Sequence, residues 1–252
     1  GGIHALASFP MEIIGELAEK VFSKYSSSAL QYDLSEGFLP LREALSIHLE
    51  KRGISTAPDT IHITSGSQGV LAAMATILIS RGDRIAVEAP TYLGAISAFN
   101  PYEPEYVRMD TDENGLIPAS LDRILTSQKI KFVYLVPTFQ NPTGRTIPHE
   151  RRVEIAEIII RHNALLLEDD PYSALRYRGE EIPPIKTLAP DNVVYVSTLS
   201  KVLAPGLRIG FHVAPDLIRK WLLLVKQGID LHTSTLNQAL ATEYLSGGYL
   251  KN

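Results

Sequence analysis

The sequence predicts an α/β domain with a mainly parallel sheet, because short apolar segments alternate along the chain with amphipathic stretches of helical length. Two of these segments, Phe132–Val136 and Leu165–Leu167, carry no charged or strongly polar residue at any position. Strands covered by helices on both faces have this continuous pattern, whereas strands with one solvated face alternate. Both observations favour a sheet buried between helices.

The expected elements follow from the spacing of the apolar residues. The first part of the chain should contain two amphipathic helices, over residues 10–26 and 39–51, joined by a polar loop over residues 31–37. Strands are expected over residues 61–64, 84–88, 105–109, 131–136, 164–168, 193–197 and 208–213. Further helices are expected over residues 68–79, 118–126, 148–162, 215–228 and 233–247.

The composition is that of an ordinary globular protein. Of the 252 residues, 45% are hydrophobic and 21% are charged, which suffices for a sizeable core. The net charge of -4 provides no general attraction to nucleic acids or anionic membranes. The sequence has no Cys, no apolar stretch near the ~20 residues of a membrane span, and no leading signal segment. We therefore expect a cytoplasmic protein without disulfides and without membrane or nucleic-acid partners.

Motifs of several other enzyme classes are missing from the sequence. The seven His residues are scattered, and no His-Glu-x-x-His spacing occurs, so we expect no metal site. There is no Gly-x-x-x-x-Gly-Lys-Ser/Thr loop for nucleoside triphosphates and no Gly-x-Ser-x-Gly nucleophile elbow.

Polar side chains follow five of the expected strands. In open parallel sheets, ligands bind beyond the carboxyl ends of the strands, so these groups should converge on one edge. The segments are Ser65–Gly69, Ala89–Tyr92, Pro137–Gly144, Asp169–Tyr172 and Thr198–Lys201.

Each segment also has an ordinary interpretation. Ser67 could cap the following helix, and Asn141-Pro-Thr-Gly144 could be a simple turn. Tyr92 could be half-buried packing, and Lys201 could be one of the many surface lysines. A carboxylate at Asp169 or Asp170 could end a solvated strand. Only the combination of the five segments separates a functional site from these alternatives.

The combination matches the needs of pyridoxal phosphate. This cofactor takes an amine for a Schiff base, donors for its phosphate, a carboxylate against the pyridine nitrogen, a donor to the phenolic oxygen and a flat partner for the ring. Lys201 supplies the amine, and Arg208 offers the paired donors that suit a phosphate. We therefore predict a pyridoxal-phosphate site at this edge of the sheet.

Three motifs in this order carry a resemblance to a known family: Asn141-Pro-Thr-Gly144, Asp169-x-x-Tyr172 and Ser197-x-x-Ser-Lys201-x-x-x-Pro-Gly-x-Arg208. The chain resembles the fold-type I pyridoxal-phosphate aminotransferases of class I/II, and most of all the branch with aromatic, alpha-aminoadipate and kynurenine aminotransferases. The resemblance implies a three-layer α/β/α large domain around a mainly parallel seven-stranded sheet.

The resemblance also implies a division of the chain. Residues 1–36 would be an N-terminal segment and helix that lead into the large domain, and residues 37–252 would be the cofactor-binding large domain. The small C-terminal domain of the family, with its arginine for the substrate α-carboxylate, would be absent. Because the chain also begins at Gly1 rather than Met, we expect it to be a piece of a longer protein.

Roles for individual residues come with the resemblance. Lys201 would form the Schiff base and shuttle the proton, Asp169 rather than Asp170 would pair with the pyridine nitrogen, and Tyr92 would stack on the ring; these three are the expected catalytic residues. The other expected cofactor-binding residues are Asn141 and Tyr172 at the phenolic oxygen, and Ser67, Gln68, Thr198, Ser200 and Arg208 at the phosphate. Gly2 and Asn141 would lie at the substrate, and cis peptide bonds would precede Pro90 and Pro142.

The implied function is ping-pong transfer of an amino group from an L-amino acid, aromatic, 2-aminoadipate or similar, to a 2-oxo acid such as 2-oxoglutarate. Tyr32 matches a tyrosine that reaches the phosphate of the neighbouring subunit, which implies a homodimer with shared active sites. Two alternatives stay open. One is the aminotransferase-like effector domain of a winged-helix transcription regulator, and the other is a pyridoxal-phosphate lyase on the same fold.

Overall fold

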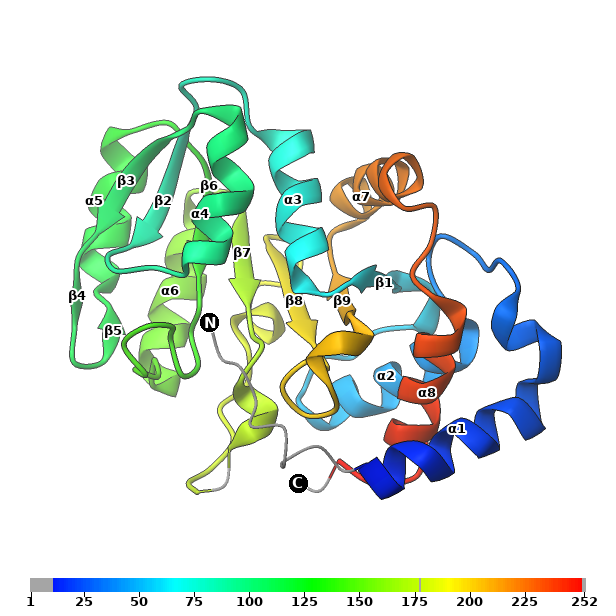
Figure 1. Ribbon diagram of the computed structural model, residues 1–252. Coiled ribbons are helices and arrows are strands. Elements are labelled where there is room, and N and C mark those ends of the chain that lie inside the picture. Colours follow the sequence, from blue (N-terminus) through cyan, green and yellow to red (C-terminus); the bar gives the residue numbers. More distant parts are fainter. Residues whose placement is uncertain (1–10, 177, 251–252) are drawn as a thin grey trace.

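The structure, a computed structural model, describes residues 11–176 and 178–250. At its centre lies a seven-stranded sheet with the strand order β1-β9-β8-β7-β6-β2-β3 (Figure 1). The strands are β1 (Ile61–Ser65), β2 (Arg84–Glu88), β3 (Glu105–Met109), β6 (Ile130–Leu135), β7 (Leu166–Asp169), β8 (Val193–Thr198) and β9 (Ile209–Val213). A separate two-stranded ribbon pairs β4 (Thr111–Asp112) with β5 (Gly115–Leu116).

The direction of the strands brings the functional segments together. β3, β2, β6, β7 and β8 pair in parallel, whereas β9 is antiparallel to both of its neighbours, β8 and β1. β1 therefore runs in the same direction as the parallel strands. In Figure 1 the arrowheads of β2, β7 and β8 accordingly point to the same side of the sheet. Because β9 runs the other way, it begins at this carboxyl edge, and Arg208 directly before it lies there too.

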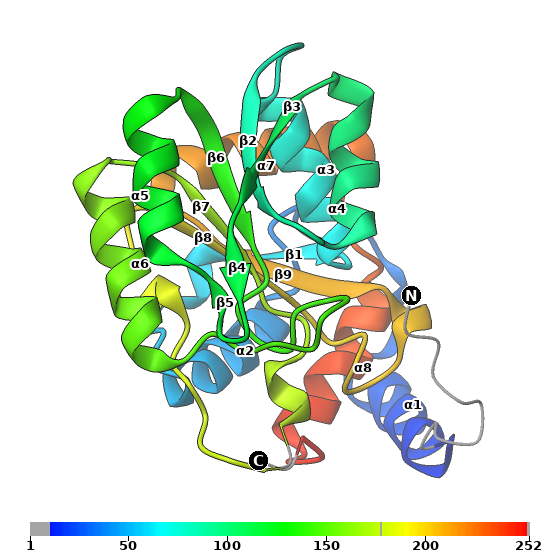
Figure 2. The same ribbon diagram turned by 90° about the vertical axis from the view of Figure 1, so that its left-hand side faces the viewer.

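Helices cover both faces of the sheet and make three layers (Figure 2). One face packs against α3 (Ser67–Leu78), α4 (Leu93–Phe99) and α7 (Asp216–Ile229). The other face packs against α5 (Pro118–Ser127) and α6 (His149–Arg161) and, near β1 and β9, against α1 (Met11–Tyr25), α2 (Leu39–Lys51) and α8 (Thr235–Ser246).

Strand β8 shows how the apolar sequence produces this arrangement. All six of its residues are buried, Val194 and Val196 in the core beneath α3 and α4, and Val193 and Tyr195 in the cores of the opposite face. Successive side chains of a strand point to opposite faces, so a strand covered on both sides must be apolar throughout.

The expected α/β fold with a mainly parallel seven-stranded sheet is confirmed, and the expected strands and helices correspond to observed ones within about two residues. Three details differ. The expected strand over residues 208–213 begins at Ile209, because Arg208 has a left-handed backbone with φ 55°. Helix α4 and the β4–β5 ribbon were not expected. None of the helices within residues 11–176 and 178–250 combines the length and the apolarity that crossing a bilayer requires.

Candidate active site

A cavity of about 410 Å³ opens at the carboxyl edge of the sheet. Its lining comes from the ends of β1, β6, β7 and β8, from the loop before α4 and from the segment before β9. The lining residues are Ser67, Gln68, Tyr92, Val136, Asn141, Asp169, Pro171, Tyr172, Thr198, Ser200, Lys201 and Arg208. The structure thus brings together every expected site residue that it describes, with the exception of Tyr32.

Asp169 is the last residue of β7 and forms the buried acidic end of the cavity, with only 2% of its surface exposed. Its Oδ2 accepts a hydrogen bond of 2.8 Å from the hydroxyl of Tyr134. Its Oδ1 is buried and has no hydrogen-bond partner among the described residues. Burial raises the pKa of Asp169 to about 7, although the Tyr134 hydrogen bond acts in the opposite direction. An unpartnered buried oxygen facing a cavity is a site for a donor or a cation.

Asp170, the alternative carboxylate, is engaged elsewhere. Its Oδ2 accepts from Arg52 Nη2 at 2.8 Å and from the hydroxyl of Tyr195 at 3.0 Å, and its Oδ1 accepts from the backbone N–H of Ser173. Asp170 and Arg52 are both buried, so the pair is shielded from water. The geometry therefore leaves Asp169, and not Asp170, free to meet a ligand in the cavity.

The other end of the cavity, called its anion end here because its groups attract negative charge, contains the N-terminus of α3 and Arg208. Gly66 turns the chain from β1 into α3 with φ 77°, and Ser67 is the first residue of the helix, so Ser67 does not occupy the cap position that the ordinary interpretation gave it. The first N–H groups of a helix have no partner within it and attract negative charge. Arg208 lies against Gly66 so closely that a Cβ at Gly66 would collide with its guanidinium. A Cβ at Gly210 would in turn collide with the Gly66–Ser67 backbone.

The last residue of β8 and the turn that follows it add two hydroxyls and an amine. Thr198 Oγ1 lies 2.9 Å from Ser200 Oγ and 2.8 Å from the carbonyl oxygen of Ile209, and it accepts from the backbone N–H of Ser200 at 3.1 Å. These bonds tie the turn after β8 to the start of β9. Lys201, in that turn, is partly buried, and its Nζ lies 5.9 Å from the centre of the Tyr172 ring.

Between the two ends lie an amide and two phenols. Asn141 Nδ2 donates to the hydroxyl of Tyr172 at 3.1 Å. Tyr92 is half-buried, and burial, with the nearby Asp169 carboxylate, raises the pKa of its hydroxyl. The expected cis peptide bonds Ala89–Pro90 and Asn141–Pro142 are present in the loops that carry Tyr92 and Asn141.

Of the expected site residues that the structure describes, Tyr32 lies outside the cavity. Tyr32 is 77% exposed, and its ring meets His232 edge-on with 5.6 Å between the ring centres. Gly2 lies outside the described residues.

The side-chain nitrogen of Gln68, a residue of the cavity lining, already has a hydrogen-bond partner, because Nε2 donates to the carbonyl oxygen of Gly94 at 2.7 Å. Gln68 therefore lines the cavity with its side chain held by the first turn of α4.

Tyr134 is a site residue that the sequence interpretation missed. It lies in the middle of the apolar segment that forms β6 and is fully buried, yet its hydroxyl fixes the Asp169 carboxylate. A buried tyrosine hydroxyl needs a hydrogen-bond partner. The presence of Tyr134 among apolar residues of β6 therefore indicated a polar group close by, which is Asp169 on the neighbouring strand β7.

The chain belongs to the family of class I and II aminotransferases, whose profile matches residues 12–251. Pyridoxal phosphate is the cofactor of this family. The residues of the cavity fit such a group: an unpartnered buried carboxylate oxygen, an amine in the same lining, and a helix N-terminus with an arginine.

Several known proteins are similar to the chain along nearly its whole length. The aromatic-amino-acid aminotransferase 1 of Thermococcus litoralis is 44% identical over 99% of this chain and 62% of its own length. The kynurenine aminotransferase of Pyrococcus horikoshii, solved in complex with PMP, is 42% identical with a TM-score of 0.94, over 100% of this chain and 64% of its own. The alpha-aminoadipate aminotransferase LysN of Thermus thermophilus, solved with N-(5'-phosphopyridoxyl)-L-leucine, is 34% identical with a TM-score of 0.92, over 99% and 64%.

A relative of another kind is the HTH-type transcriptional regulator YdfD of Bacillus subtilis, 33% identical over 96% of this chain and half of its own length. The chain thus spans about 62–64% of the length of the similar aminotransferases and half of the regulator.

Proposed function

We propose that the chain is the cofactor-binding part of an aminotransferase that moves an amino group from an L-amino acid to a 2-oxo acid such as 2-oxoglutarate, in two half-reactions of a ping-pong mechanism. The amino donor is an aromatic amino acid, 2-aminoadipate or a similar compound. The similarity to enzymes named for these substrates supports the choice.

The observation that carries the proposal is the carboxylate of Asp169. It is almost completely buried in the lining of the cavity, with Oδ2 fixed by Tyr134 and Oδ1 unpartnered among the described residues. A buried charge without a partner destabilises the fold, and such groups are typical of sites that a ligand completes. The protonated pyridine nitrogen of a bound cofactor would supply the missing donor and positive charge.

The other cavity residues divide the remaining roles. When bound, pyridoxal phosphate supplies an aldehyde for amines and a ring that withdraws electrons from the substrate α-carbon. Ser67, Thr198, Ser200, Arg208 and the N–H groups of α3 would hold its phosphate, with Gln68 beside them. Asn141 and Tyr172, already joined by a hydrogen bond of 3.1 Å, would hold the phenolic oxygen, and Tyr92 would cover a ring face.

We assign to Lys201 the covalent bond with the cofactor and the proton transfer at the substrate α-carbon. A primary amine on a flexible stem can both form a Schiff base and accept a proton at Nζ. Asn141 would in addition contact the substrate, and Gly2 would lie near it. We also propose a homodimer in which the exposed Tyr32 reaches the phosphate site of the partner subunit, because among the described residues its ring meets His232 and does not line the cavity of its own chain.

A second candidate function is the effector domain of a transcription regulator. The similarity to YdfD supports it, and the cavity would bind the same cofactor in either case. The two functions differ in turnover: an enzyme releases a 2-oxo acid repeatedly when a second oxo acid is present, whereas an effector domain needs only to bind. Product analysis with both substrates present separates them, and it also identifies a lyase, which needs no acceptor.

The test uses the full-length protein, loaded with pyridoxal phosphate, reduced with borohydride and analysed by mass spectrometry. Wild type and Lys220→Ala, which removes an exposed lysine of α7, should retain the cofactor mass on the peptide that contains residue 201. Lys201→Ala should retain none on that segment, and it should lose the visible absorption band that a suitable amino donor bleaches in the wild type. Covalent attachment at another lysine in the wild type would overturn the assignment.

A further inference from the structure

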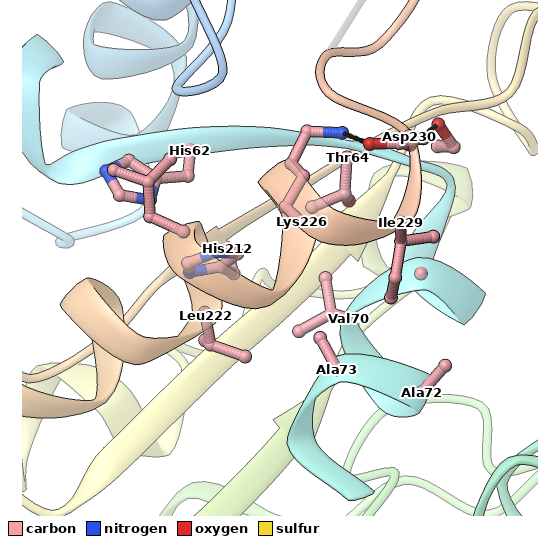
Figure 3. Close-up of a pocket in the computed structure, with 13 residues that line it drawn as sticks. His62, Thr64, Val70, Ala72, Ala73, His212, Leu222, Lys226, Ile229 and Asp230 are labelled. Atoms are coloured by element: carbon pink, nitrogen blue, oxygen red, sulfur yellow. Dashed lines mark hydrogen bonds and ion pairs between the residues drawn. The ribbon is translucent and has the colours of Figure 1, made fainter. Parts of the chain in front are cut away.

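The C-terminal end of α7 carries a buried cation that the proposed chemistry does not use. Lys226 projects from α7 toward β1, and its side chain is only 8% exposed. Its Nζ donates to Asp230 Oδ1 at 2.7 Å and to Thr233 Oγ1 at 3.0 Å. Figure 3 shows Lys226 reaching Asp230 at the edge of a small cavity, with His62 and His212, which also line it, to the left of Lys226.

The second oxygen of Asp230 leads from this ion pair to the anion end of the active site. Asp230 Oδ2 accepts a hydrogen bond of 2.7 Å from Ser65 Oγ, and Ser65 is the last residue of β1. The carbonyl oxygen of Ser65 accepts from Arg208 Nη2 at 3.4 Å. Lys226, Asp230, Ser65 and Arg208 therefore form a continuous chain of contacts from α7 to the guanidinium beside Gly66.

The position of Gly66 leaves little freedom in this region. Its backbone is in the left-handed region and lies between Arg208 on one side and the Gly210 backbone on the other. A rotation of Ser65 would move both the N-terminus of α3 and the carbonyl oxygen that Arg208 contacts. A hydrogen bond that fixes the Ser65 side chain consequently fixes the geometry in which the anion is received.

Below the ion pair, α7 meets the sheet across a cavity of about 70 Å³ lined largely by apolar side chains, among them Val70 and Leu222. The Nδ1 atoms of His62 and His212 are buried without partners among the described residues, so these imidazoles do not bind α7 to β1 through those atoms. The polar connection between this end of α7 and β1 runs through Lys226, Asp230 and Thr233, which lies 3.5 Å from Ser65 Oγ.

We propose that Asp230, oriented by Lys226, is a positioning residue for the phosphate of the cofactor: it holds Ser65 and thereby sets the Gly66–Ser67 turn and the Arg208 guanidinium. The inference rests on the proposed function, since the anion is the cofactor's phosphate. Asp230 itself does not touch the ligand. Removing its charge should therefore weaken the binding of a phosphate-bearing ligand and leave the binding of the same ring without phosphate unchanged.

The experiment compares dissociation constants for pyridoxal phosphate and for pyridoxal, measured by absorbance titration of the full-length cofactor-free protein. Asp230→Asn keeps the size of the side chain, and Ser65→Ala and Lys226→Met remove its two partners. Asp216→Asn is the matched control, because Asp216 lies at the other end of α7 and its exposed carboxylate pairs with Arg219.

We expect pyridoxal phosphate to bind five- to tenfold more weakly to Asp230→Asn and Ser65→Ala, with the affinity for pyridoxal unchanged and Asp216→Asn equal to wild type. Equal weakening of both ligands would show a merely structural role, and unchanged affinities would also overturn the inference. Should Asp230→Asn fail to fold, Ser65→Ala decides the outcome in the same way. If the wild type itself binds both ligands equally, the proposed function fails instead, which the Lys201 attachment test would show independently.

Discussion

Replacing Asp169 with Asn should make the cofactor-free protein more stable at neutral and alkaline pH. In the folded protein burial raises the pKa of this carboxyl from its ordinary value of 3.8 to about 7. The folded state therefore binds more protons than the unfolded state between pH 3.8 and about 7, and stability falls as the pH rises through this window. At about 1.36 kcal/mol per pKa unit, the carboxylate costs the folded state roughly 4 kcal/mol at pH 8 and almost nothing below pH 4.

The assay is urea unfolding of wild type and Asp169→Asn at intervals from pH 4 to pH 8. Two other buried carboxyls, Glu88 and Glu168, have pKa values raised to about 7 by burial, so the wild-type profile alone does not isolate Asp169. Both remain in the variant, and the difference between the two profiles cancels them. That difference should be small at pH 4 and should grow toward roughly 4 kcal/mol at pH 8, in favour of the variant.

Addition of pyridoxal phosphate at pH 8 should reverse the order. A cation on the ring nitrogen offsets the cost of the carboxylate, so saturating cofactor should raise the unfolding midpoint of the wild type more than that of Asp169→Asn. Parallel pH profiles for the two proteins without cofactor would refute the reasoning, because the Asp169 carboxyl would then titrate alike in the folded and unfolded states.

Two further predictions concern the ends of the site. Gly66→Ala should weaken pyridoxal phosphate binding at least tenfold, because its Cβ would collide with the Arg208 guanidinium. Gly82→Ala has a similar φ of 79° and open space around it, so backbone strain should lower its free energy of unfolding by only roughly 1 kcal/mol and leave cofactor binding unchanged. Cofactor titration and urea unfolding of both variants check this. Arg52→Met should destabilise the protein by roughly 3–5 kcal/mol because it leaves the Asp170 carboxylate buried without its cation, whereas Arg81→Met, which breaks an exposed pair with Glu103, should change the free energy of unfolding by less than about 1 kcal/mol.

Local pattern was enough to find the strands, most of the helices and the cavity residues, because the signals are local. Apolar segments mark buried strands, and the polar groups of the site follow those strands directly in the sequence. Helix α4, Leu93–Phe99, was not predicted from the sequence, because it has only seven residues and no clear apolar repeat.

The remaining features depend on contacts between residues that are distant in sequence. Arg52 meets Asp170 across 118 positions, and Tyr134 meets Asp169 across 35, so no local window contains both partners. The antiparallel direction of β9, which places Arg208 at the carboxyl edge, is likewise a property of strand pairing in the sheet and leaves no mark in the hydrophobic period.

The pleat of β7 explains how two adjacent carboxylates acquire opposite physical roles. Consecutive strand residues point to opposite faces, and the chain continues the ladder past β7 through the Asp170 N–H and the Val196 carbonyl at 2.8 Å. Asp169 thus shares a face with Tyr134, on the side of α3 and α4, and Asp170 shares the other face with Tyr195, where α2 ends beside Arg52. Among the described residues, Arg52 pairs with the Asp170 carboxylate, whereas no cation is paired with the Asp169 carboxylate. The Asp170 charge is therefore compensated within the folded protein, whereas the Asp169 charge destabilises the folded state until a ligand supplies its partner. This is why Arg52→Met should lower the free energy of unfolding and Asp169→Asn should raise it.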